Sequence, residues 1–549
     1  MARLDRLATV KSLAQLGATL GREFSYTLLQ AMTAEDEETV RQELQQLVGA
    51  EVLYQRGLPP QAMYVFKHAL IQDAAYQSLL KRTRQQYHQH IAQVLEAQFP
   101  ETVAMQPELL AHHYTEAGLG APALDYWQRA GEQALQRSAH VEAISHLRKG
   151  LEVLQGLPTT PERLQHEMQL QLTLGMPLSA TRGYAAPEVA QLYRRAQALC
   201  QRLGETPQLI PALLGLWRFY SIRGELGIAR ELAEQCLLLT QRVGDPARLI
   251  VVHDVLGETL FFLGEFLRAR AHLEQAVALY DPQRRRPHRA LTDPGLSSLS
   301  MLAGNLWILG YPAQAQQQIT TALRQAEALT HPHVLAGVWL IAAHCFQLWR
   351  DVRMTQVQAE AIMTVATEQG LPVWLSEAAV FVGWAQALQG QGAAGVARSQ
   401  HGVATRKAVG SDLAQPVYLG MVAEAHACAG QPTTGLTVLA DALVLANTTG
   451  DRWGEAELHR LRGTLLLAVS ADYAREAEAC FHQALTVARR QEAKAWELRT
   501  ATSLSRLWQQ QGKRAEAYAL LAPIYGWFTE GFDTADLQEA KILLEELAG

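Results

Sequence analysis

GEFLRARAHLEQAVALYDP, residues 264–282, sets the spacing that decides the fold. Gly264 is followed five residues later by Ala269, seven further on by Ala276 and six beyond that by Pro282. A glycine and two small residues recur at this spacing along the chain, mostly at intervals of about 40 residues. The matching sets are Gly118, Ala123 and Ala130; Gly224, Ala229 and Cys236; Gly310, Ala315 and Ala322; Gly390, Gly395 and Gly402; Gly430, Gly435 and Ala442; Asp472, Ala477 and Ala484; and Gly512, Ala517 and Ile524.

This spacing predicts pairs of antiparallel helices. The glycine closes a tight turn between the two helices, where a left-handed backbone costs least without a side chain. The small residues share one face of the second helix and let a neighbouring helix approach closely. Large residues at matching places fill the interface, namely Trp217, Tyr220, Leu260 and Leu306. Because one pair cannot bury its apolar face alone, we expect the pairs to stack, each contacting mainly its neighbours.

The predicted fold class is therefore all-α, a superhelical solenoid over roughly residues 105–549. Its repeat resembles the tetratricopeptide repeat, although it is longer than the ideal of about 34 residues. The alternative is an irregular helical bundle. Residues 353–370 fit the spacing poorly but keep a helical pattern. We place the solenoid domain at 101–549.

Residues 1–100 lack the repeat and form a second predicted domain. Helical patterns cover 4–20, 24–33 and 36–48, and an alternating stretch with Gly-Leu-Pro-Pro then predicts a β-hairpin before helices at 68–80 and 84–98. This is the order of a winged helix, whose third helix can enter a DNA groove. Here that helix carries Glu35, Asp36, Glu37 and Glu38, which phosphates would repel. A packing module is the favoured interpretation.

The bulk composition excludes several classes of function. A net charge of -6 gives no footprint for nucleic acid or anionic lipid. No apolar run is long enough for a membrane span, and the N-terminus lacks the apolar core of a secretory signal. The five cysteines lie far apart, which is typical of a reducing compartment and predicts a cytoplasmic protein.

No catalytic motif is present in the sequence. It contains no phosphate-binding Gly-x-x-x-x-Gly-Lys-Ser/Thr, no His-Glu-x-x-His and no Gly-x-Ser-x-Gly. His112 and His113 are interpreted as ordinary helix residues and not as metal ligands. We therefore expect no enzymatic activity, no catalytic residue, no cofactor and no metal.

The first helix of each pair is expected to line the concave face of the solenoid. The repeat register places eight residues there, combining both signs of charge with large aromatic rings, a mixture that suits a protein or peptide partner. A small-molecule site would instead need a closed pocket with convergent polar groups. The candidate protein-binding residues are Arg218, Asp254, Glu258, Phe262, Trp307, Trp384, Glu424 and Arg460.

Several stretches resemble the C-terminal half of large bacterial signalling proteins. Those proteins combine a class III adenylate/guanylate cyclase, an AAA/STAND-type ATPase and tetratricopeptide repeats. The similar stretches, in order, are ARLDRLATVKSLAQLGATLGREFSY (2–26), FKHALIQDAAYQSLLKRTRQQYHQHIA (66–92), GYAAPEVAQLYRRAQALCQRLG (183–204), YDPQ (280–283), LWILGYPAQA (306–315) and YGWFTEGFDTADLQEAKILLEEL (525–547).

The resemblance implies a role for each domain. Residues 1–100 would be the winged-helix lid of the ATPase, and the repeats a sensor or partner-binding arm. The cyclase and ATPase motifs of the family are absent from this sequence, so neither activity carries over. Because the similar text starts at residue 2, we expect a truncated or split form. Three roles remain open: a regulatory scaffold, the small-molecule-sensing arm of a STAND-type transcriptional regulator, and a subunit that works with a separately encoded cyclase–ATPase half.

Overall fold

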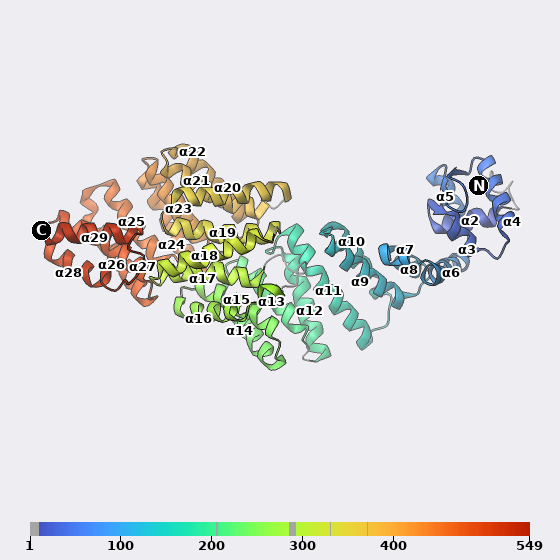
Figure 1. Cartoon of the computed structure of the whole chain (residues 1–549), viewed down its shortest axis with the longest axis horizontal. Coiled ribbons are helices and arrows are strands. Elements are labelled where there is room, and N and C mark those ends of the chain that lie inside the picture. Colours follow the sequence, from blue (N-terminus) through green and yellow to red (C-terminus); the bar gives the residue numbers. More distant parts are fainter. Residues whose placement is uncertain (1–9, 205–206, 285–292, 330, 370–371) are drawn as a thin grey trace. The chain divides into compact units, whose positions relative to one another are not determined.

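The computed structural model describes residues 10–204, 207–284, 293–329, 331–369 and 372–549 and is almost wholly helical (Figure 1). The chain divides into two compact units, Met1–Thr181 and Arg182–Gly549, here called unit 1 and unit 2. The all-α fold class is confirmed. The boundary at residue 100 that the sequence suggests concerns a functional module inside unit 1 and stays a prediction.

Unit 1 begins with the helices and the hairpin expected from the sequence. Helices α2 (Lys11–Leu20), α3 (Tyr26–Met32) and α4 (Glu37–Gly49) precede the hairpin of β2 (Leu53–Arg56) and β3 (Met63–Phe66). A third strand, β1 (Glu23–Ser25), pairs antiparallel with β3 and gives the sheet order β1-β3-β2. Phe24 of β1 packs on the rings of Tyr64 and Phe66. The sequence analysis missed this strand because three residues carry too little alternation to be recognised.

The acidic start of α4 has a local structural role. Asp36 is the N-cap, and its carboxylate accepts hydrogen bonds from the backbone N–H groups of Glu38 and Thr39. Glu37 pairs with Arg41 one helical turn later. Acidic residues in a first turn also interact favourably with the positive end of the helix dipole. The acidic residues at the start of α4 therefore stabilise the helix itself.

The rest of unit 1 is helical. Helices α5 (Ala69–Gln77) and α6 (Lys81–Gln98) follow the sheet, and α7 (Pro100–Met105), α8 (Pro107–Glu116), α9 (Gly120–Gln136), α10 (His140–Gln155) and α11 (Pro161–Arg182) complete the unit. The early repeat is present here, with Ala123 and Ala130 buried on α9. The N–H of the Trp127 indole donates to the Thr115 hydroxyl of α8 over 3.0 Å.

A group of three histidines lies inside unit 1, between α6 and α8. Nδ1 of His88 is 2.8 Å from Nδ1 of His113, so one ring donates and the other accepts, and the His88 Nε2 is 3.0 Å from the Tyr76 hydroxyl. The His112 ring meets the His88 ring edge-on. In the parts of the chain that the structure describes, no cluster of His, Cys, Asp or Glu has the arrangement of a metal site.

We expect unit 1 to lose stability as the pH falls from about 6.5 towards 4. Burial, followed by neighbouring His charges, lowers the pKa of His88 to about 4 and of His113 to about 3. The unfolded chain then binds more protons than the folded chain in this window, so the stability present above the unfolded pKa is lost on acidification. One pKa unit corresponds to about 1.4 kcal/mol, so the total reaches a few kcal/mol.

This pH dependence can be measured at Trp127, the sole tryptophan in the sequence of unit 1. Fluorine NMR of 5-fluorotryptophan-labelled protein would follow urea unfolding at each pH, with the Trp127 signal assigned from Trp127→Phe. His113→Gln keeps a hydrogen-bonding side chain that does not titrate, and it should flatten the dependence. The neighbouring charged groups Arg84, Glu116 and Lys149 remain in both proteins. An equal slope in wild type and variant would contradict the assignment to the histidines.

Unit 2 consists of successive antiparallel helix pairs. They are α13 and α14 (Leu209–Ile222, Leu226–Val243), α15 and α16 (Pro246–Phe262, Phe266–Leu279), α17 and α18 (Pro294–Ile308, Pro312–Glu327), α19 and α20 (Pro332–Leu348, Val352–Gln369), α21 and α22 (Pro372–Leu388, Gly392–Ala408), α23 and α24 (Gln415–Cys428, Pro432–Thr449), α25 and α26 (Glu455–Val469, Ala474–Arg490) and α27 and α28 (Lys494–Gln510, Arg514–Tyr525). Helix α12 (Pro187–Leu203) precedes the pairs and α29 (Ala535–Ala548) follows them, and short 3-10 turns cover Pro282–Arg284 and Ala471–Tyr473.

The small residues of the repeat are buried where the helices touch, as predicted. Each of the six recurring glycines in unit 2 has a positive φ. Residues 353–369 of the segment that fits the spacing poorly nevertheless lie in the regular second helix α20, and residue 370 lies outside the described residues. The fully buried small residues of unit 2 include Ala229, Cys236, Ala269, Ala276, Ala315, Ala322, Ala442, Ala477, Ala484 and Ala517.

The first helices of successive pairs, from α15 to α27, contact one another. That they line the inner, concave side of unit 2 stays a prediction. Helix α17 is almost completely buried, and α15 is buried over Val252–Phe261, including polar residues such as Asp254, Ser298 and Asn305. Among the described residues, no helix is both long enough and apolar enough to cross a bilayer.

The ends of the first helices α13, α15, α17 and α19 also contact elements four or five helix pairs further along the chain. The Ile222 carbonyl, at the end of α13, accepts hydrogen bonds from the N–H groups of Asp412 and Leu413 just before α23, over 2.8 and 3.1 Å. The Phe262 carbonyl, at the end of α15, accepts from Arg452 and Trp453 just before α25, over 2.8 and 3.2 Å. The expectation that each pair contacts mainly its neighbours is therefore incomplete. Successive turns of the superhelix also contact each other. We call this line of contacts the seam.

The seam continues towards the C-terminus. At the end of α17, Trp307 packs edge-on against Trp496 of α27, with ring centroids 5.1 Å apart. At the end of α19, the Leu348 carbonyl accepts a 2.7 Å hydrogen bond from Arg499. Arg350 then forms an ion pair with Glu539 of α29 over 2.8 Å.

The glycine that opens the quoted stretch serves two purposes at this seam. Gly264 has φ 76°, as the turn between α15 and α16 requires. A Cβ atom placed on it would also lie 2.3 Å from the amide nitrogen of Gln491 and 3.5 Å from the Arg452 carbonyl oxygen. The glycine thus closes its own turn and makes room for the next turn of the superhelix.

Candidate functional site

The first helices of unit 2 carry a series of charged and aromatic side chains, here called the inner strip. At its N-terminal end, Arg218 of α13 donates a 2.9 Å hydrogen bond to the carboxylate of Glu258 on α15, and its guanidinium lies 4.3 Å from the centre of the Trp217 ring. The Arg218 side chain keeps 23% of its exposure, whereas Glu258 is buried. Arg218 is therefore a cation that is held in one position and that solvent can reach.

Asp254 lies one helical turn before Glu258 and is buried. Its carboxylate accepts a 2.8 Å hydrogen bond from the Ser298 hydroxyl of α17. Burial, and then the negative charge of Glu258, raise the pKa of Asp254 to about 8. Asp254 is therefore largely protonated at neutral pH. This weakens the electrostatic repulsion between the two carboxyl groups on adjacent helical turns.

The aromatic side chains of the strip are mostly buried. Phe262 at the end of α15 is half-buried and contacts the Trp453 ring across the seam. Trp307 is 4% exposed, and Arg499 lies over both its ring and that of Trp496 at 5.1 Å from each centre. Trp384 is 2% exposed. The two predicted tryptophans thus shape the strip from beneath and do not project into solvent.

The C-terminal end of the strip contains a second charged group. The Trp384 indole N–H donates to the Glu424 carboxylate of α23 over 2.6 Å, and burial raises the pKa of Glu424. Arg460 of α25 forms two 2.7 Å hydrogen bonds to the carboxylate of Glu457, one helical turn earlier. Glu424 and Arg460 are half-buried, so both remain accessible.

The structure brings the eight predicted residues together in smaller groups. Arg218, Glu258 and Asp254 form the first group, and Trp384 with Glu424 forms another. Arg460 joins Glu457, and Trp307 lies in the seam.

The sequence analysis missed Arg499, Asp536 and Glu457, which hold one another at this end of the strip. Arg499 holds Asp536 of α29 through hydrogen bonds of 2.6 to 3.1 Å and also lies 3.6 Å from Glu457. Arg499 could have been found by extending the register one further pair. Asp536 lies beyond the last repeat, where the register gives no information.

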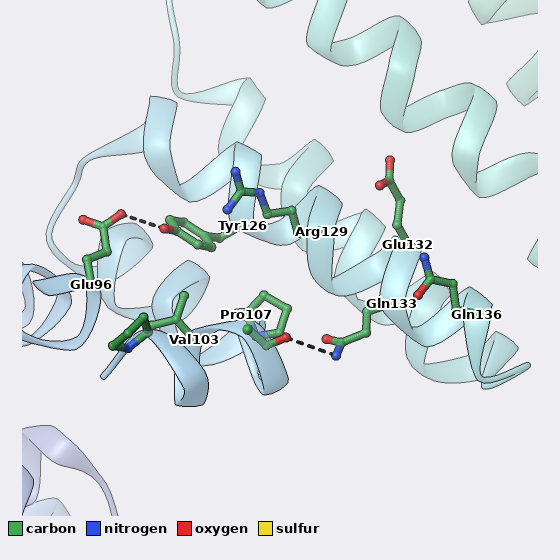
Figure 2. Close-up of a pocket in the computed structure, with 10 residues that line it drawn as sticks. Glu96, Val103, Pro107, Tyr126, Arg129, Glu132, Gln133 and Gln136 are labelled. Atoms are coloured by element: carbon green, nitrogen blue, oxygen red, sulfur yellow. Dashed lines mark hydrogen bonds between the residues drawn. The ribbon is translucent and has the colours of Figure 1, made fainter. Parts of the chain in front are cut away.

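A separate hollow of about 490 Å³ lies in unit 1, between α6, α7, α8 and α9 (Figure 2). Figure 2 shows the Glu96 carboxylate accepting a 2.6 Å hydrogen bond from the Tyr126 hydroxyl, and Glu96 also accepts from Tyr114. Burial and Glu96 raise the pKa of Tyr126 to about 12. Arg129 lies over the Tyr126 ring at 5.1 Å. Gln133 donates to the backbone carbonyls of Ala104 and Met105. These contacts are those of a packed helix junction, and no residue pattern in the sequence indicated the hollow.

Comparison with known proteins gives one relative and several distant structures. No family model matches the chain. An uncharacterized protein of Rhizobium meliloti (strain 1021) is 25% identical over 473 residues, which are 84% of this chain and 45% of that protein. The chain therefore spans less than half the length of this curated relative.

Several solved structures are similar to the chain at low sequence identity. A Rap protein complexed with competence and sporulation factor has a TM-score of 0.45 and 13% identity, covering 77% of this chain and 99% of that one. The human IFIT1 dimer with PPP-AAAA has a TM-score of 0.39 and 14% identity, covering 83% and 92%. A STAND protein with a tetratricopeptide repeat sensor from Pyrococcus horikoshii has a TM-score of 0.35 and 10% identity, covering 98% and 64%.

The fold and the inner strip together define the class. The chain is a tetratricopeptide-like helical solenoid preceded by a small module with three helices and a three-stranded sheet.

Proposed function

We propose that the protein is a regulatory scaffold that binds a protein or peptide partner through the inner strip and has no catalytic activity of its own. The observation that carries the proposal is the pair of charged groups at the two ends of the strip. Arg218 is held by Glu258 and Trp217, and Arg460 is held by Glu457. Charged side chains already fixed in one rotamer lose less entropy on binding than free ones.

The residues of the strip divide into two roles in this proposal. Arg218, Phe262, Glu424 and Arg460 would touch the partner, because their side chains remain accessible. The buried residues would support them from beneath, and these are Asp254, Glu258, Trp307 and Trp384.

The proposed partner is an ATPase-bearing polypeptide of the cyclase–ATPase kind that the sequence resembles, encoded separately or in a longer product of which this chain is a part. Residues 1–100 would dock on that ATPase as its lid. Three exposed leucines of this module support a docking role, namely Leu58 in the hairpin, Leu70 on α5 and Leu80 before α6, at 79%, 80% and 78% exposure. These apolar side chains are available for contact with the ATPase polypeptide.

The strip can be tested with paired arginine substitutions. The double variant Arg218→Met and Arg460→Met keeps the apolar stems and removes both charges. We expect binding of the purified ATPase polypeptide, measured by calorimetry, to weaken about tenfold or more, equivalent to about 1.4 kcal/mol. The control is Arg398→Met with Arg475→Met, two exposed arginines on the second helices α22 and α26. Circular dichroism would confirm that all variants are folded.

The outcomes separate the strip from the N-terminal module. If the control weakens binding as much as the strip variant does, the inner strip is not the binding surface. Leu70→Asp tests the module at a fully accessible position, and loss of binding in that variant alone would make the module the sole contact. Equal binding by all of these variants would contradict both halves of the proposal.

A second candidate function is the sensing of a small effector, as in STAND-type transcriptional regulators. The carboxyl groups of the strip favour it, since burial raises the pKa of Asp254 and of Glu424, and carboxyl groups with perturbed pKa values are typical of binding sites. A change in thermal stability on adding an effector, with no partner protein present, would support this candidate.

A further inference from the structure

A small pocket opens at the seam, beside the C-terminal end of the inner strip. Gln347 of α19 contributes one wall from one turn of the superhelix. Glu424 of α23, Glu457 of α25, Trp453 and Trp496 contribute the others. Its inner volume is about 30 Å³. Since one water needs about 10–15 Å³ measured in this way, the pocket holds a group of two or three non-hydrogen atoms.

Two indole N–H groups at this pocket have no acceptor. Trp453 and Trp496 are each 2% exposed, and among the described residues neither Nε1 finds a hydrogen-bond partner. The equally buried Trp217 and Trp384 donate to Thr259 and Glu424. An unpaired buried donor costs about 1–3 kcal/mol, so two of them in one small pocket favour a ligand that supplies acceptors.

The same pocket offers acceptors to a ligand that donates. Glu424 has one carboxylate oxygen bonded to the Trp384 indole, and Glu457 is bonded to Arg460. Each carboxylate has lone pairs beyond these bonds. The Met421 and Leu348 side chains add apolar surface at the pocket, which suits a methylene stem.

These groups discriminate between ligand chemistries. A cation would satisfy the carboxylates but leave both indoles unpaired, and an anion would face Glu424 and Glu457. An alcohol has one donor for two carboxylates. A primary carboxamide has two N–H donors, an oxygen with two lone pairs and three non-hydrogen atoms, and therefore matches the pocket in both size and number of hydrogen bonds.

We propose that the seam pocket binds a primary carboxamide, the end of a glutamine or asparagine side chain in the partner segment. This inference rests on the proposed function, because it names one side chain of the partner that the inner strip would bind. Since Gln347 lies on one turn of the superhelix and Trp453 and Trp496 on the next, an occupied pocket also ties the two turns together.

The experiment uses the full chain labelled with ¹⁵N-tryptophan and observes the indole N–H signals, with acetamide as the probe. Trp453→Phe and Trp496→Phe assign the two signals. We expect acetamide to move both signals downfield in a saturable manner, with a millimolar or weaker Kd as its few atoms allow. Acetate and acetone are matched in shape but lack the donors, and they should not move either signal. N-acetylglutamine amide should bind at least as well as acetamide.

Together with the control ligands, the Glu424→Gln variant shows whether the pocket binds a carboxamide or holds only water. Glu424→Gln keeps an oxygen for the Trp384 indole but removes the carboxylate, and it should weaken acetamide binding about tenfold. No saturable shift, or equal shifts with acetate and acetone, would mean that the pocket holds water only and would overturn the proposal. Binding of acetamide but not of N-acetylglutamine amide would overturn the side-chain source. If acetamide fails while the partner still depends on Arg218 and Arg460, the carboxamide pocket alone is rejected.

Discussion

Replacing Glu377 with alanine is expected to lower the free energy of unfolding around α21–α23 by about 3–5 kcal/mol, because it leaves a buried cation without its counter-charge. Arg406 is 1% exposed and pairs with Glu377 of α21. Its guanidinium also donates to the Leu413 carbonyl over 2.6 Å and lies 4.5 Å from the centre of the Tyr418 ring. The same Arg406 therefore holds the segment before α23 that meets α13 at the seam.

The effect can be located by hydrogen exchange with mass spectrometry in increasing urea. Protection should fall first in α21–α23 and in the end of α13. The double variant Glu377→Ala with Arg406→Met removes both charges and should recover most of the loss, since an apolar replacement of a buried pair is often neutral. Glu360→Ala, which removes a carboxylate on the neighbouring α20, serves as the control. A single-variant cost no larger than that of this control would show that Arg406 does not depend on Glu377.

The second large effect is expected at Gly310. Gly310 and Gly390 occupy the same place in the repeat, with φ of 93° and 91°. Alanine at either position should cost about 1–2 kcal/mol for the backbone conformation. A Cβ at Gly310 would also lie 2.5 Å from the Trp527 ring and 2.9 Å from the Cβ of Lys494, whereas Gly390 has no atom within 4 Å. The added overpacking should cost a further 1–3 kcal/mol, roughly.

The difference between Gly310→Ala and Gly390→Ala isolates the seam, because the backbone strain is common to both. Urea unfolding would give the two free energies. Hydrogen exchange of Gly310→Ala should show loss of protection near residue 310 and again in α27 and at Trp527, whereas Gly390→Ala should affect only its own pair. Equal costs for the two substitutions would mean that the seam contributes nothing to stability.

The elements of unit 2 could be predicted from the sequence because each depends on neighbours in the chain. Turn glycines such as Gly264 and small residues such as Ala269 act within one helix pair or between adjacent pairs. The seam could not be predicted, because it depends on how small rotations between pairs add up over five of them. Carbonyl groups such as that of Ile222 leave no trace in the residue pattern, since every residue has one.

The inner strip was predictable only in part, for the same reason. The register named Arg218, Glu258, Trp384 and Glu424 only as separate groove candidates. It did not predict that Arg218 bonds Glu258 and that Trp384 bonds Glu424 across adjacent first helices. It placed Trp307 in the groove, where the next superhelical turn covers it. The unpaired indoles of the seam pocket were invisible to the sequence, since only packing decides whether an indole finds an acceptor.

The seam also changes how unit 2 responds to mechanical load. A solenoid whose coils do not touch extends like a soft spring, because each pair tilts slightly on its neighbours. In this chain the coils rest on one another through the hydrogen bonds at Ile222, Phe262 and Leu348. Stretching along the axis would pull on all of these hydrogen bonds at once. They would then have to break together before the turns could separate. We therefore expect unit 2 to resist extension along its axis more strongly than a solenoid whose turns do not touch.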